Sequence, residues 1–231
     1  MIELSDLHFR YGEGSFELSV PELRIARGEH VAIVGPSGVG KTTLLSLIAG
    51  LCMPAQGRVS IDGVDLANLG ESARRNFRAR HIGLIFQEFA LLEYLSVLDN
   101  VLLPFRINTS LCLDSGARAR VSVLAEQLRI ADKLMRLPAQ LSQGERQRVA
   151  VCRALSVGAK VLLADEPTGN LDPENAQRVL DLLFVAAEEN AATLLMVTHD
   201  RDLVSHFERV VSLEAPPTCS DGTLGSVEAT R

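Results

Sequence analysis

A glycine-rich turn between a strand and a helix constrains this 231-residue chain more than any other feature. Residues 31–34 (Val-Ala-Ile-Val) form an apolar run typical of a strand buried on both faces. Residues 41–49 follow with a helical pattern that Gly50 closes. Between them, residues 35–42 read Gly-Pro-Ser-Gly-Val-Gly-Lys-Thr, which is the full G-x-x-x-x-G-K-[ST] pattern. We therefore expect a phosphate-binding loop between a buried strand and the N-terminus of a helix.

The residue types of this loop suit the phosphates of ATP. Glycines let backbone N–H groups turn inward without side chains in the way, and the helix adds its positive dipole end. In this pattern Lys41 reaches the β- and γ-phosphates, and the Thr42 hydroxyl holds Mg²⁺. A chance glycine-rich turn with an exposed lysine is the alternative, and it leaves the flanking strand and helix unexplained. The predicted ATP-binding residues of the loop are Gly35, Pro36, Ser37, Gly38, Val39, Gly40, Lys41, Thr42 and Thr43.

Two carboxylates follow a second buried strand. Residues 161–166 read Val-Leu-Leu-Ala-Asp-Glu, so the acids lie at the carboxyl end of the strand, where α/β sheets bind their ligands. Asp165 suits the shell of Mg²⁺, and Glu166 suits a general base that acts on the attacking water. An acidic turn after a strand is common by itself, and the phosphate loop is what gives this one its predicted role.

The pattern along the chain predicts an α/β fold: a P-loop NTPase core with a mixed sheet, an N-terminal antiparallel β subdomain and an inserted α-helical subdomain. We expect one domain over residues 1–231, with the helical insertion at about 88–157 and a loose tail at about 214–231. A further helix is expected at 173–190. The remaining strands are expected at residues 2–9, 16–25, 59–61, 82–86, 193–197 and 209–213.

Composition excludes several functions. A net charge of −6 argues against nucleic-acid binding, which needs a basic face. The longest apolar run, residues 44–53, falls far short of the ~20 residues of a membrane span, and early acidic residues argue against a signal peptide. The four cysteines lack C-x-x-C spacing, and three are expected in the core. One basic cluster is predicted to be a solvated helix face, formed by Arg74, Arg75, Arg78 and Arg80.

The next motif resembles the signature of the ABC ATPase family, and the resemblance extends over nearly the whole chain. The family's usual L-S-G-G-Q is here L-S-Q-G-E, formed by Leu141, Ser142, Gln143, Gly144 and Glu145. Ser142 and Glu145 also have the spacing of a capping box, and the two interpretations are compatible. The resemblance implies that this motif faces ATP held by a second subunit, and Gln143 adds a Cβ where the family usually has none.

Other positions match the family residue by residue. Gln87 resembles the Q-loop glutamine, with a catalytic and Mg²⁺-binding role, and His199 resembles the switch histidine at the γ-phosphate. Asp172 resembles the D-loop aspartate, and Tyr11 resembles the aromatic residue that stacks on adenine. Plainer alternatives are a polar strand end for Gln87, a helix cap for His199, an N-cap before Pro173 for Asp172, and a core-covering ring for Tyr11.

The family resemblance implies the ATP-binding and ATP-hydrolysing subunit of an ABC transporter. Such a subunit forms a head-to-tail homodimer around two ATP and Mg²⁺ and drives a separate integral membrane subunit from the cytoplasmic face of the membrane. Residues 167–172 resemble the group that serves lipoprotein release, macrolide export and cell division. Apolar residues between 89 and 95 are predicted to contact the membrane partner, or else to pack inside the helical subdomain. The alternatives are a P-loop kinase of a small metabolite and a cytosolic ABC ATPase without a transport role.

Overall fold

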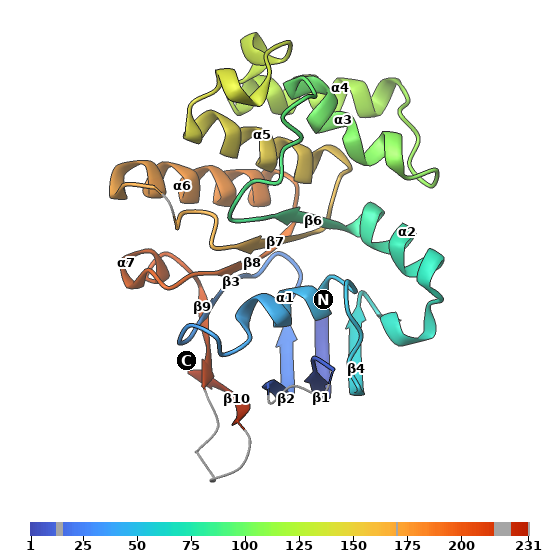
Figure 1. The fold of residues 1–231 in the computed structure, drawn as a ribbon, viewed down its shortest axis with the longest axis vertical. Helices are drawn as coiled ribbons and strands as arrows, with labels where there is room; N and C mark the ends of the chain where they lie inside the picture. Colours follow the sequence, from blue (N-terminus) through green and yellow to red (C-terminus); the bar gives the residue numbers. More distant parts are fainter. Residues whose placement is uncertain (13–15, 170, 215–222, 231) are drawn as a thin grey trace. The chain divides into compact units, whose positions relative to one another are not determined.

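The computed structural model describes residues 1–12, 16–169, 171–214 and 223–230, and the chain forms two compact units (Figure 1). The first unit combines Met1–Arg75 with Leu195–Arg231, and the second is Asn76–Leu194. The second unit is larger than the predicted helical insertion at 88–157, because it also contains two strands and the helix after them. That the two units act as one ATPase domain stays a prediction.

An antiparallel sheet opens the first unit. Strand β1 (Ile2–Arg10) pairs with β2 (Phe16–Ile25) on one side and with β4 (Gln56–Ile61) on the other. Asp62 and Gly63 turn β4 into β5 (Val64–Asp65) with φ of 51° and 80°, the left-handed pair that a two-residue hairpin requires. The predicted antiparallel subdomain is present.

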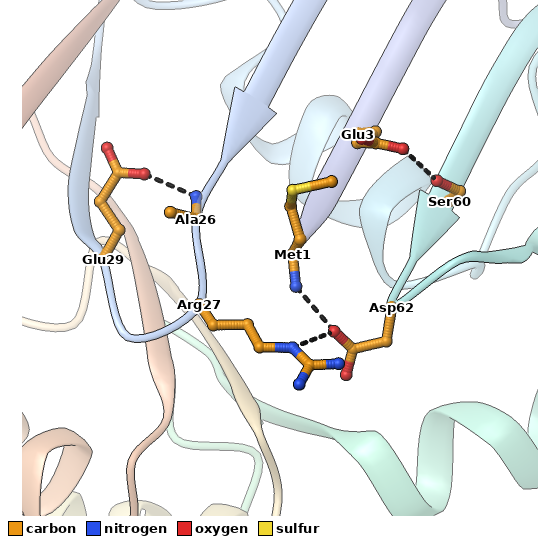
Figure 2. A network of polar contacts seen from close by, with 7 residues as sticks. All are labelled: Met1, Glu3, Ala26, Arg27, Glu29, Ser60 and Asp62. Carbon is orange, nitrogen blue, oxygen red and sulfur yellow. Dashed lines mark hydrogen bonds and ion pairs between the residues drawn. The ribbon is translucent and has the colours of Figure 1, made fainter.

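Polar contacts join the ends of these strands (Figure 2). The N-terminal ammonium of Met1 and the Nε of Arg27 both donate to Oδ1 of Asp62, at 2.7 and 2.8 Å. These contacts, the ammonium first, lower the pKa of Asp62. Glu29 accepts from the backbone N–H of Ala26 at 2.7 Å and so closes the turn before the next strand. The network joins the start of β1 to the segments that follow β2 and β4. It lies near the start of the next strand, β3, whereas the phosphate loop follows the end of that strand.

Strand β3 (His30–Val34) pairs in parallel with β9 (Arg209–Glu214), and helix α1 (Lys41–Ile48) follows the loop after β3. The strand order within the unit is β5-β4-β1-β2-β10-β9-β3. β10 (Thr223–Thr230) pairs antiparallel with β9 and parallel with β2. The predicted loose tail is therefore wrong for residues 223–230, which form a strand because two neighbours offer backbone partners; residues 215–222 and 231 lie outside the described residues.

The second unit places helices around two parallel strands. β6 (Ile82–Ile85) pairs with β7 (Val161–Asp165), and a Cβ at Gly83 would lie 2.6 Å from the carbonyl oxygen of Ala154, so glycine permits this close approach. Residues 88–157 contain helices and no strand, as predicted. The helices of the unit are α3 (Val97–Ile107), α4 (Ser115–Gln127), α5 (Gln143–Ser156) and α6 (Pro173–Glu189), with short 3₁₀ turns at Ala131–Lys133 and Pro138–Gln140.

Two elements carry the chain between the units: α2 (Glu71–His81) and β8 (Thr193–Val197). α2 buries no residue, and its Arg75 and Arg80 are exposed as predicted, whereas Arg74 and Arg78 are half-buried, so the solvated helix face is confirmed in part. A further short helix, α7 (Arg201–Val204), and a 3₁₀ turn at Leu66–Asn68 belong to the first unit. None of the helices in the described ranges is long and apolar enough to cross a membrane.

The cysteines only partly follow the sequence prediction. Cys152 is buried in α5, and burial raises the pKa of its thiol to about 12. Cys52 is half-buried. Cys112 is exposed, because it lies in the connection between α3 and α4 and not in a helix that packs on the core, so its core placement is wrong. Cys219 lies outside the described residues.

Candidate active site

The loop after β3 has the backbone that its glycines predict. Gly35, Gly38 and Gly40 have φ of 156°, 80° and 107°, all in the region that side chains disfavour. A Cβ at Gly35 would also lie 2.4 Å from the carbonyl oxygen of Leu213 on β9. The loop therefore follows a path between strand and helix that requires glycine. Pro36, Ser37 and Gly38 are exposed at its outer edge, and Val39 is buried beneath.

Lys41 is held inside this loop. Its side chain is buried, and its Nζ donates to the carbonyl oxygens of Gly35 and Pro36 at 2.8 and 2.9 Å. An ammonium has three donors, so these contacts leave the third for a phosphate oxygen. The N-cap of α1 is Gly40, which has no side chain to cap the first N–H groups. The hydroxyl-bearing Thr42 is exposed in the same turn. A cation and uncapped N–H groups at a helix N-terminus fit the phosphates of a nucleotide.

Tyr11 lies beside the same helix. Its hydroxyl is 3.4 Å from Oγ1 of Thr43, and its ring meets Phe9 edge-on with centroids 4.7 Å apart. Phe9 is buried, whereas Tyr11 is 53% exposed. The ring of Tyr11 thus covers little of the core, and its position next to the phosphate loop suits stacking on a base.

His199 follows β8 and is exposed within the first unit. The preceding residue, Thr198, is buried, and its N–H donates to the carbonyl oxygen of Ile33 on β3 at 3.1 Å. Since β3 leads directly into the phosphate loop, this bond fixes the backbone beside His199 at the loop's end of the strand. The turn after it is closed by Thr198, whose Oγ1 accepts from Asp200 N–H at 3.1 Å.

In the second unit, Asp165 ends β7 and Glu166 follows it, and both are half-buried. Glu166 has a φ of 44°, an uncommon conformation for a residue with a side chain. Its carbonyl oxygen accepts from the N–H of Gly169 at 3.1 Å. Oε2 of Glu166 and Nε2 of Gln87 lie 3.5 and 3.4 Å from the point where a Cβ of Gly169 would stand. The structure therefore brings Gln87 close to Glu166 and Gly169, which lie about 80 residues further along the sequence.

The signature-like motif begins α5 with the predicted capping box. Oγ of Ser142 accepts from the N–H of Glu145 at 3.3 Å, and Oε2 of Glu145 accepts from the N–H of Ser142 at 2.8 Å. The hydrogen bond from the backbone N–H of Ser142 lowers the pKa of Glu145. The positive charge of Lys133, 3.8 Å away, lowers it further. Leu141 is buried and anchors the turn, whereas Ser142 and Gln143 are exposed and Gly144 is half-exposed.

Asp172 is the N-cap of α6, with Pro173 in the first turn. Its carboxylate accepts from the backbone and the side chain of Asn175, at 3.1 and 2.6 Å. The side-chain bond from Asn175 is the main cause that lowers the pKa of Asp172. The predicted capping role is confirmed, and the D-loop role is untested. Asn170 lies outside the described residues.

Sequence reasoning missed two residues of α5. The fully buried Gln147 donates through Nε2 to the carbonyl oxygen of Pro167, just after the acidic strand end. Arg153 donates to the carbonyl oxygens of Phe89 and Ala90, each at 2.6 Å. Phe89 and Ala90 have φ of 61° and 47°, and burial lowers the pKa of Arg153. The available signal was a polar residue, Gln147, on the apolar face of α5.

No group of three or more His, Cys, Asp or Glu side chains that could hold a metal ion occurs among the residues described. Each unit carries side-chain oxygen atoms of the kind that Mg²⁺ takes: Thr42 in the first unit, and Asp165 and Gln87 in the second.

Comparison with known proteins decides the family. A family model described as "ABC transporter" matches residues 18–169. This chain belongs to the ABC transporter family. It is therefore an ATP-binding and ATP-hydrolysing subunit of an ABC transporter, and family membership disfavours the small-metabolite kinase.

Relatives of this ABC ATPase support the assignment. It is 44% identical to the uncharacterized ABC transporter ATP-binding protein YbbA of Escherichia coli, over 92% of this chain and 94% of the relative. It is 42% identical to the lipoprotein-releasing system ATP-binding protein LolD of Chromohalobacter salexigens, over 93% and 91%. It is 40% identical to the macrolide export protein MacB of Rhodopirellula baltica, over 93% of this chain and 32% of that longer protein.

Solved structures agree with the fold. The dimeric structure of MJ0796, described as a bacterial ABC transporter cassette, matches with a TM-score of 0.81 and 34% identity, over 93% of this chain and 94% of that chain. A post-hydrolysis state of MJ0796 with ADP and Pi matches with a TM-score of 0.80 and 32% identity, over 100% and 99%.

Proposed function

We propose that this ABC ATPase powers a transporter of the lipoprotein-release and macrolide-export group, as a homodimer that drives a separate integral membrane subunit from the cytoplasmic face. The observation that carries its nucleotide chemistry is the loop around Lys41, with an uncapped helix behind it. The similarity to LolD and MacB supports the group.

The phosphate loop binds and orients ATP in this proposal. Lys41 donates its third N–H to the β- and γ-phosphates, and the first N–H groups of α1 bind the remaining oxygens. Tyr11 stacks on the adenine from its exposed position beside Thr43. Thr42 and Asp165, with Gln87, hold Mg²⁺. When bound, Mg²⁺ neutralises charge on the transferred phosphoryl group.

Glu166 acts as the general base. Its carboxylate accepts a proton from the attacking water, and its unusual backbone conformation aims the side chain. Gln87, close to the same glycine as Glu166, orients that water. His199 donates to the γ-phosphate from the turn that Thr198 anchors to β3.

The signature-like motif completes the site in trans. Ser142 and the start of α5 face the ATP of the second copy, and Asp172 crosses the same dimer interface. The capping box uses two polar groups of the turn, those of Ser142 and Glu145. The exposed Gln143 lies at the turn's surface, where it can meet the second copy.

A surface on the second unit suits the membrane subunit. Of the predicted apolar residues, Phe89 is buried and Leu91, Leu92 and Leu95 are half-buried, so these four pack at least partly inside the second unit. Tyr94 is 76% exposed. Residues 134–136 run beside the start of α3, since Val97 N–H donates to Arg136 O at 2.8 Å, and they expose Met135. The exposed side chains of Tyr94 and Met135 can receive a helix of the membrane partner.

The nucleotide assignment is tested with Lys41→Ala and a matched control, Lys160→Ala, which removes a lysine on the surface of the second unit. We expect calorimetry to detect no tight ATP binding by K41A, because a charge-assisted contact is lost, and unchanged binding by K160A. Near-normal affinity of K41A would overturn the assignment.

The docking surface is tested with Tyr94→Asp, which we expect to abolish co-purification with the membrane subunit. A Tyr94→Asp variant that still co-purifies with the same membrane protein as the unmodified chain would overturn the docking surface.

A further inference from the structure

We infer that Gln147 is a positioning residue for ATP hydrolysis and holds the backbone next to Glu166. Gln147 lies in α5, its side chain is fully buried, and its Nε2 donates to the carbonyl oxygen of Pro167. Pro167 directly follows Glu166, so α5 reaches the turn after β7 through this contact. The inference rests on the proposed role of Glu166 as the general base and adds a residue that acts through it.

The turn after β7 is held from two sides. The ring of Pro167 fixes its φ, so the direction of its carbonyl group depends on ψ alone. The hydrogen bond from Gln147 fixes this carbonyl group from α5. Within the turn, the N–H of Gly169 donates to the carbonyl oxygen of Glu166 at 3.1 Å. These two contacts therefore hold the peptide groups before and after Pro167.

Glu166 depends on such support because its backbone conformation is unfavourable. Its φ of 44° is uncommon for a residue with a side chain, and such a conformation persists only where the surroundings determine it. Without the contact from Gln147, the carbonyl group of Pro167 can rotate and Glu166 can relax. The carboxylate then leaves the position in which it acts on the attacking water, and a small displacement of a catalytic group is enough to slow a reaction.

Stability alone does not account for an amide at position 147. The Oε1 of Gln147 is buried and has no hydrogen-bond partner in the part of the chain that the structure describes. A buried acceptor without a donor is unfavourable, so an apolar side chain of the same length would avoid this penalty although it loses the bond to Pro167. The next buried residues of α5, Val149 and Ala150, are apolar. We therefore expect Gln147→Met to fold and to affect the reaction.

ATPase kinetics of the full chain test this role. We expect Q147M to lower kcat about tenfold and to leave KM for ATP within about twofold, because the contact matters only when the water attacks. Ser156→Ala is the control, since Ser156 is also fully buried in α5 and its hydroxyl donates to the carbonyl oxygen of Arg153 at 2.8 Å. Ser156 lies about 13 Å further along the helix, so S156A should keep its kcat. Unchanged kcat in Q147M, or an equal fall in S156A, would overturn the inference.

A double variant shows whether Gln147 acts through Glu166. In single-turnover experiments we expect Q147M combined with E166Q to hydrolyse ATP at the rate of E166Q alone, within about twofold, because the position of a side chain without basicity matters little. A further fall of about tenfold would show an independent role and overturn the inference. Gln147→Leu replaces Q147M in both experiments if that variant does not fold. Normal turnover in E166Q alone would overturn the proposed general base and this inference with it, whereas slow E166Q beside normal Q147M would overturn this inference alone.

Discussion

Glu166, the proposed general base, has a strained backbone. A residue with a side chain at φ 44° costs on the order of 1–3 kcal/mol, and such strain persists where the surroundings determine the conformation. Here the hydrogen bond from Gly169 N–H to Glu166 O closes the turn. The carboxylate of Glu166 lies near Gly169, and the side-chain amide of Gln87 lies near the same glycine.

The first prediction concerns this carboxylate. Glu166→Gln keeps the shape of the side chain and removes its basicity, and general-base assistance is worth roughly 10²–10⁴-fold. We expect ATP turnover to fall about a hundredfold or more while ATP affinity, measured by calorimetry, stays near normal. Glu188→Gln, at an exposed glutamate of α6, is the control and should change neither. Turnover within a few-fold of normal in E166Q would remove Glu166 from the reaction.

Arg153 is predicted to position the loop after Gln87. It donates to two consecutive carbonyl oxygens of residues in left-handed conformations, so its loss frees the loop that holds Gln87. We expect Arg153→Met to lower kcat several-fold with little change in KM for ATP, and to reduce the free energy of unfolding by about 1.5–3 kcal/mol.

The conservative change Arg153→Lys separates this role from a purely structural one. Lysine retains the charge and can donate to one of the two carbonyls, so R153K should recover part of kcat. A variant series in which stability falls while kcat stays constant would contradict the positioning role.

At the scale of elements, the start of α5 depends on an ionised carboxylate. The N–H of Ser142 and the charge of Lys133 hold the pKa of Glu145 below its usual 4.5. A lowered folded pKa contributes stability that is present above the unfolded pKa and is lost as pH falls through the folded pKa. We expect wild type to melt at a higher temperature than Glu145→Gln at neutral pH, and the difference to vanish below the folded pKa.

A melting-temperature difference that is constant with pH would show that the charge of Glu145 does not stabilise the cap. Glu188→Gln offers a control, because it removes an exposed carboxylate near the C-terminal end of α6 and not one from an N-terminal cap. Its effect should have a different pH dependence from that of E145Q.

Local patterns predicted most elements, and long-range partners decided the rest. Two strands, at 31–34 and 161–164, were predictable because a continuous apolar run is typical of a buried strand. The phosphate loop was predictable because its glycines are needed for its backbone conformation. β10 was missed because Thr223–Thr230 becomes a strand only beside β2 and β9. Arg153 and Gln147 were missed because their partners are backbone carbonyls, which carry no signal of residue type.

In the candidate site, too, local contacts were predictable from the sequence and long-range contacts were not. Lys41 and Ser142 act through contacts within a few residues, so their motifs predicted their geometry. The proximity of Gln87 to Glu166 depends on the parallel pairing of β6 and β7, which no motif in the sequence predicts.

At the scale of the whole molecule, the chain contains one phosphate loop and one signature-like motif, and in the proposed site these come from different copies. The phosphate loop of each copy can meet the signature-like motif of the other, and these two equivalent contacts form a closed dimer with twofold symmetry. ATP is expected to bridge them, so the dimer should form only when nucleotide binds and is not hydrolysed.

The last prediction tests this assembly. Glu166→Gln, which should bind ATP without turning it over, is run on a sizing column with and without ATP and Mg²⁺. We expect the dimer only with ATP. Adding Lys41→Ala to E166Q should abolish dimerisation, because the bridging nucleotide is lost, and adding Ser142→Arg should abolish it while ATP binding persists, because the bulky cation disrupts the second copy's contact. Persistence of the dimer in the S142R combination would show that a surface other than the signature joins the two copies, and a monomer with ATP at high concentration would contradict the dimer itself.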